Sequence, residues 1–126
     1  MPDKQCDKPN NSNPDGTWEE ERTIQRMGGQ RALIVKLATL FLRDAPVQLE
    51  QALSGIKKQD YESSHIAMHS LKGTSSNFCT IRFENICAKL LVALAERDWG
   101  RAMEVHHNLS AEYLLLAKEF DEFTKQ

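Results

Sequence analysis

The chain lacks the features that mark membrane-spanning, secreted or nucleic-acid-binding proteins. No stretch approaches the ~20 consecutive apolar residues that a transmembrane helix needs, and the N-terminus has no apolar run typical of a signal peptide. Lys and Arg number 16 against 18 Asp and Glu, a net charge of −2. Because so balanced a surface attracts neither nucleic acid nor an anionic membrane, we expect no partner of either kind.

Cysteine is scarce, and no nucleotide-binding loop is present. The three cysteines, Cys6, Cys79 and Cys87, show no CxxC spacing, and one stays unpaired under any intrachain scheme. This usage favours a reducing, cytoplasmic setting. No glycine-rich loop of the kind that cradles phosphates occurs, so we expect no bound nucleotide and no other cofactor.

The 126 residues are enough for one domain with a core, and too few for two ordinary ones. Residues 1–16 are rich in Asn, Asp, Lys and Pro and offer little to bury, which predicts a disordered polar tail. Residues 17–126 should form the folded domain. Met1 and the polar tail favour a free-standing protein over a segment of a larger kinase.

Two helices are predicted in the first half of the domain. Thr17 and Glu20 have the spacing of a capping box, which predicts a short helix that ends at Gly28 and Gly29. Helical periodicity resumes at Gln30 and continues to Lys58. Pro46 predicts a kink or restart within that segment.

Three more helices follow at close spacing. Asp60 can cap a helix over about 61–77, Thr80 one that runs to about Arg97, and Asp98 one that runs nearly to the end. The links are so short that sequential helices should be antiparallel. The sequence therefore predicts an all-α fold, an up-down antiparallel four-helix bundle with a short N-terminal covering helix.

One segment combines residues that suit phosphoryl chemistry. His69, Lys72 and Gly73 share one helix face, although a mid-helix glycine costs ~1 kcal/mol relative to alanine. An exposed imidazole has a pKa near ~6.5, so at neutral pH it is mostly uncharged and nucleophilic toward a reactive phosphoryl group. Lys72 could neutralise the attached phosphate. Gly73, with Ser76, would leave an unobstructed surface for a partner protein.

The same segment resembles the signature of histidine-containing phosphotransfer (HPt) domains, the phosphoryl-carrying modules of multi-step two-component relays. The pattern His-x-Leu-Lys-Gly is matched by His69, Leu71, Lys72 and Gly73. The resemblance covers about residues 18–123. Further matches along the chain are the turn at Met27, Gly28 and Gly29, the pair Leu40 and Phe41, Pro46, and Cys87.

The resemblance implies a phosphocarrier and not an enzyme. His69 would be the phosphoacceptor, Lys72 would stabilise phosphate charge, and Lys72, Gly73 and Ser76 would contact the partner. The implied partners are response-regulator receiver domains, with a hybrid sensor histidine kinase as a further candidate. The protein itself is expected to be a monomer without a metal or other cofactor.

Two positions depart from the family pattern. Cys79 stands where members usually have a glycine, and since cysteine disfavours positive φ, we expect Asn77 to adopt the left-handed conformation instead. Leu91 stands where some members have Gln or Glu, so no hydrogen bond to phosphate is expected from that position.

Alternative interpretations remain. The protein could be a helical adaptor or inhibitor that docks on a kinase or receiver without carrying phosphate. Glu62, His65 and His69 also have metal-ligand spacing on a helix, but a second matching helix is missing. Of the other histidines, His106 is predicted to pack at the edge of the core and His107 to lie on the surface.

Overall fold

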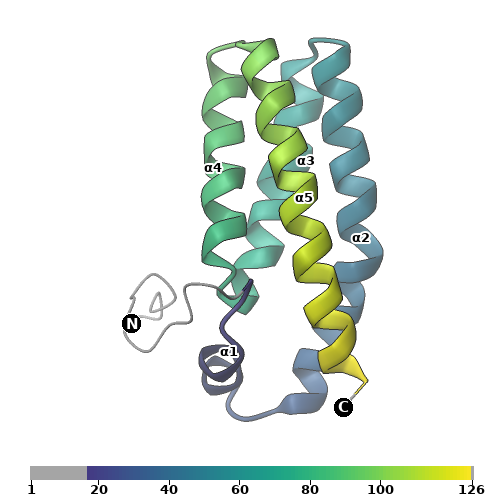
Figure 1. Ribbon diagram of the computed structural model, residues 1–126, viewed down its shortest axis with the longest axis vertical. Coiled ribbons are helices and arrows are strands. Elements are labelled where there is room, and N and C mark those ends of the chain that lie inside the picture. The colour runs from purple at the N-terminus through teal and green to yellow at the C-terminus, as the bar shows by residue number, and fades with distance from the viewer. Residues whose placement is uncertain (1–16, 126) are drawn as a thin grey trace.

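The computed structural model describes residues 17–125 and is built from helices (Figure 1). The predicted disordered tail, residues 1–16, lies outside the described residues. No helix within residues 17–125 is long and apolar enough to cross a membrane. The elements are α1 (Glu20–Arg26), α2 (Arg31–Lys57), α3 (Tyr61–Ser75), the 3₁₀ turn η2 (Ser76–Phe78), α4 (Ile81–Ala95) and α5 (Trp99–Thr124).

The four long helices stand side by side, and α1 lies at the end of the bundle where α2 begins and α5 ends (Figure 1). Helix α2 packs on α3, α3 on α4, α4 on α5, and α5 on α2, which closes the bundle. This arrangement confirms the predicted all-α four-helix bundle with a short N-terminal covering helix.

Aromatic side chains fill the end of the bundle next to α1. Trp18 meets the rings of Phe78, Phe120 and Phe123 edge-on, with centroid separations of 5.0 to 6.1 Å. Phe41 of α2 contacts Phe78 and Phe120 as well. Such pairs contribute ~0.5–1.5 kcal/mol each beyond the burial of their area. The cluster therefore ties the segment before α1 to η2 and α5.

The connections between the long helices use left-handed residues that are not glycine. Gln59, Cys79 and Arg97 have φ of 56°, 54° and 57°. The prediction that Asn77 takes this role is wrong, since Asn77 is helical in η2 and Cys79 itself is left-handed. The left-handed conformation costs roughly 1–2 kcal/mol for a residue with a Cβ. At Cys79, the Thr80 hydroxyl offsets part of this cost by donating to the Ser75 carbonyl at 2.9 Å.

Helix α2 does not restart at Pro46, which was one of the two outcomes predicted for this proline. It runs without interruption from Arg31 to Lys57, with Pro46 inside. A proline in a helix interior removes one hydrogen bond and costs ~3 kcal/mol or more. Ala45 and Leu49 are buried on the inner face whereas Pro46 is exposed, so packing of that face holds the helix together while the proline ring points to solvent.

The first predicted cap is also wrong. Helix α1 begins at Glu20 with Glu19 at the N-cap, and no side chain caps it. Thr17 is buried instead, next to the buried Trp18, and its hydroxyl has no hydrogen-bond partner within the described chain. The side chain of Thr80 likewise makes no cap bond to α4.

The two cysteines within residues 17–125 differ. Cys87 is a free, buried thiol of α4, and burial raises its pKa to about 12. Cys79 is disulfide-bonded.

Candidate functional site

Helix α3 turns His69 toward solvent. The helix begins where Asp60 accepts a hydrogen bond from the Ser63 amide at 3.2 Å, as the sequence predicts. Its inner face buries Ala67, Met68 and Leu71 against the rest of the bundle. His69 lies between these positions on the opposite face, and its side chain is exposed.

Contact with α2 fixes the rotation of α3. No space separates Gly55 of α2 from Ser64 of α3, because a Cβ on Gly55 would lie 2.9 Å from the Cβ and the amide nitrogen of Ser64. Six residues further along α3, the Gln48 amide donates to the Ser70 hydroxyl at 2.9 Å. His69 lies between these two contacts, so its backbone is held on a rigid element.

The predicted site residues lie in the second half of α3 and, for Ser76, in η2 directly after it. Lys72 is half-buried and Gly73 is exposed. No atom lies within 4 Å of a Cβ built on Gly73, so close packing does not explain this glycine. Ser76 lies in η2, where its hydroxyl donates to the Gly73 carbonyl at 2.8 Å and its carbonyl accepts from Arg26 at 3.0 Å. The Ser76 hydroxyl therefore donates its hydrogen bond to a carbonyl at the end of α3.

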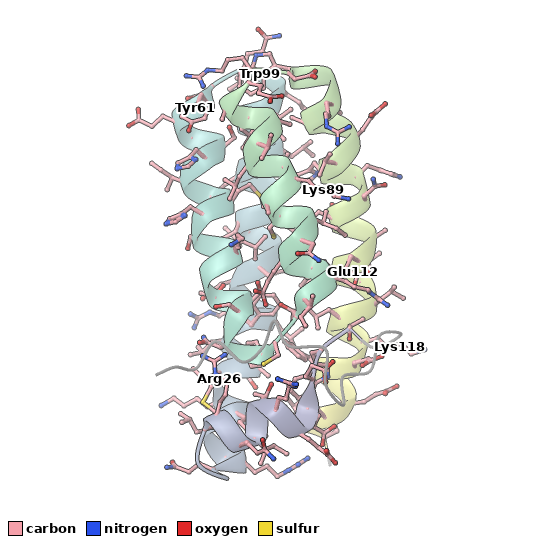
Figure 2. The ribbon with its side chains drawn as sticks, turned by 90° about the vertical axis from the view of Figure 1, so that its left-hand side faces the viewer. Arg26, Tyr61, Lys89, Trp99, Glu112 and Lys118 are labelled. Atoms are coloured by element: carbon pink, nitrogen blue, oxygen red, sulfur yellow. The ribbon has the colours of Figure 1, made fainter. Side chains whose placement is uncertain are left out.

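A carboxyl group near Lys72 was not singled out from the sequence. Glu84 of α4 is partly buried, and this burial raises its pKa. A hydrogen bond from the Thr80 hydroxyl at 3.0 Å and the charges of Lys72 and Arg26 oppose that rise. Arg26 comes from the end of α1, which Figure 2 shows beside the lower part of the bundle. The charges of two cations, Lys72 and Arg26, therefore act on the Glu84 carboxyl group.

Aromatic contacts extend from His69 toward the other end of α3. The His65 and His69 rings are stacked with centroids 5.8 Å apart and an angle of 7° between their planes. Tyr61 stacks on His65 in turn, at 5.2 Å and 24°. The sequence contained a signal for this row, because Tyr61, His65 and His69 follow each other at intervals of four and so share a helix face.

The remaining candidates have ordinary surroundings. Leu91 is half-buried against the core. His106 is buried and its Nε2 lies 2.8 Å from the Leu49 carbonyl, whereas His107 is exposed, as predicted for both. Within residues 17–125, no group of three or more His, Cys, Asp or Glu side chains is arranged to hold a metal ion.

Comparison with known proteins supplies one match. The family model of the Hpt domain matches residues 36–123. This range contains α3, η2 and α4 entire, together with most of α2 and nearly all of α5. No curated protein and no solved structure gives a significant match to the chain.

Proposed function

Because the chain belongs to the Hpt domain family, we propose that His69 accepts a phosphoryl group from an aspartyl phosphate of a receiver domain and passes it to the aspartate of another. The family supports a carrier role in two-component signalling and not a kinase activity. The assignment to His69 rests on its match to the family signature and on its exposure at the middle of α3.

The transfer requires little chemistry from the carrier. The unprotonated ring nitrogen of His69 attacks phosphorus, the bond from phosphorus to the acyl oxygen breaks, and the aspartate leaves as a carboxylate. The imidazolium formed loses a proton to water. The reverse sequence on a second receiver returns His69 to its free state. A receiver's own acidic pocket would supply any magnesium that the reaction needs.

The observation that carries this proposal is the free space beside His69. In-line attack requires the donor protein to approach the ring closely. Gly73 lies one turn beyond His69, and no atom lies within 4 Å of a Cβ built on it. Lys72 extends from the same turn, where its ammonium can offset the phosphate charge. A receiver domain can therefore approach His69 along the surface at Gly73, where no side chain stands in the way.

The test is to mix the protein with a receiver domain that carries a radiolabelled aspartyl phosphate. The wild type should acquire label that is labile in acid and stable in base, as phosphohistidine is. His69→Gln should acquire none and should keep its fold, since an exposed side chain contributes little to the core. His65→Gln and His107→Gln, at the neighbouring and the distant control positions, should still be labelled.

Each alternative has a distinct result. A wild type that binds the receiver without acquiring label would support the adaptor. Loss of label in His65→Gln, with label retained in His69→Gln, would move the phosphoacceptor to His65. Tight stoichiometric binding of Zn²⁺ by the wild type, lost in both variants, would support the metal site.

A further inference from the structure

Four side chains form a continuous stack along the outer face of α3. The Arg97 guanidinium lies over the Tyr61 ring, 3.8 Å from its centroid. Tyr61 stacks on His65, and His65 stacks nearly parallel to His69. Figure 2 shows Tyr61 at the end of the bundle near Trp99, which begins α5. The stack therefore begins at the turn between α4 and α5 and ends at His69.

The end of the stack that is distant from His69 is anchored by several contacts. Arg97 is left-handed, and its guanidinium donates to the Ala95 carbonyl at 3.1 Å at the end of α4. Tyr61 is half-buried and packs against the hydrophobic core. Its hydroxyl lies 3.3 Å from the Nδ1 atom of His65, within hydrogen-bonding distance. His65 is thus held by a ring stack and by a polar contact.

The other end of the stack is held by His65 alone. Within residues 17–125, no hydrogen bond or ion pair fixes the imidazole of His69, and its one ring contact is with His65. An exposed histidine without such a contact would share its time between about two χ1 wells and about two ring orientations in a helix. Most of those states would turn the reactive nitrogen away from a given donor.

We propose that His65 is a positioning residue for His69. Its ring, held by Tyr61 and Arg97, restricts the imidazole of His69 to one orientation, so that the donor meets a preorganised nucleophile. The inference rests on the proposed role of His69 as phosphoacceptor. His65 itself forms no bond to phosphorus, and the aromatic surface that it offers matters more than its nitrogen atoms.

The test compares His65→Ala, which removes the stack, with His65→Phe, which keeps an aromatic ring, and with His107→Ala as the matched control. The rate of transfer is measured in single turnovers with the carrier in saturating excess, so that receiver affinity does not enter. His65→Ala should slow transfer about fourfold, the number of orientations then open to His69. His65→Phe and His107→Ala should transfer at close to the wild-type rate.

A spectroscopic readout separates positioning from a loss of stability. The ring protons of His69 should lose the ring-current shift from His65 in His65→Ala, and melting temperatures should show that each variant is folded. A wild-type rate in His65→Ala, or a His65→Phe protein as slow as His65→Ala, would overturn the proposal. Failure of the phosphoacceptor assignment would look different, because His69→Gln would then still be labelled.

Discussion

Gly73 shows how a single residue can serve contact at the expense of helix stability. It is helical, exposed and without neighbours that a side chain would meet, yet alanine there would stabilise the helix by ~1 kcal/mol. We predict that Gly73→Glu and the neutral Gly73→Gln block transfer from the receiver, because a long side chain would stand beside His69. Melting followed by circular dichroism should show no loss of stability, and the labelling assay should show the block.

Gly100 provides the matched control, since it is also helical with no atom within 4 Å of a built Cβ, but it lies at the start of α5. Gly100→Glu should transfer phosphate like the wild type. A Gly73→Glu protein that transfers at the wild-type rate would exclude this glycine from the contact surface.

Glu84 links stability to pH. Burial raises its pKa above the ordinary value of 4.5, so the folded protein binds this proton more tightly than the unfolded chain does. The resulting stabilisation is complete below the unfolded pKa and is lost as pH rises through the folded pKa. Charged Glu84 is therefore a cost at neutral pH, which the Thr80 hydroxyl and the cations nearby reduce.

We predict that Glu84→Gln removes this pH dependence. The free energy of unfolding of the wild type, minus that of the variant, should fall as the pH is raised from about 4 toward neutrality. Urea unfolding of both proteins at a series of pH values measures this difference in the free energy of unfolding. A difference that rises with pH would mean that the charges of Lys72 and Arg26 outweigh burial at Glu84.

At the scale of helices, the contact of Gly55 with Ser64 sets how closely α2 approaches α3. A Cβ at Gly55 would lie 3.1 Å or less from backbone and side-chain atoms of Ser64, so the two helices would have to separate. Gly55→Ala should therefore lower the free energy of unfolding by ~1–3 kcal/mol, the usual cost of overpacking. Denaturant unfolding measures the change.

The comparison variant for this prediction is Gly100→Ala, where the added methyl group meets no neighbour. It should be no less stable than the wild type. If Gly55→Ala were equally stable, the two helices would be able to adjust their separation at little cost.

Helix starts were predictable where one polar side chain determines them. Asp60 and Asp98 cap α3 and α5 through amides three residues on, as their spacing indicates. The starts and ends that depend on tertiary packing were not predictable. Pro46 is accommodated because Ala45 and Leu49 on the inner face of α2 are buried, and Thr17 is buried together with Trp18. In both places, burial in the folded bundle outweighs the local helix and capping propensity of the residue.

For the molecule as a whole, sequence periodicity gives the bundle but not every inward-facing residue. Phe83, Cys87, Leu90 and Leu94 recur at helical spacing in α4 and are buried, whereas the apolar residues Leu33 and Val47 of α2 are 38% and 55% exposed. Ile34 and Ala38 are buried instead. Helix α2 packs against both α3 and α5, and its buried stripe combines Phe41 and Ile56 with small residues such as Ala38.

In the candidate site, too, some features follow from sequence spacing and others depend on tertiary contacts. The grouping of His69, Lys72 and Gly73 on one surface follows from spacing alone. The position of the Arg97 guanidinium over the Tyr61 ring could not be inferred that way, because it depends on how the turn before α5 meets the first turn of α3. The role of Glu84 depends on the contact of α4 with α3, which is also invisible in a single segment.

The closed order of packing has a consequence for the kinetics of folding. Three of the four main helix pairs, α2 with α3, α3 with α4 and α4 with α5, are joined by short turns, and only α2 with α5 brings together distant parts of the chain. Contact order is therefore low, and such topologies fold in about microseconds to milliseconds. The one step with a large loop-closure entropy is the docking of α5 on α2. Contacts made in that step, among them the one from His106 to the Leu49 carbonyl, should form late.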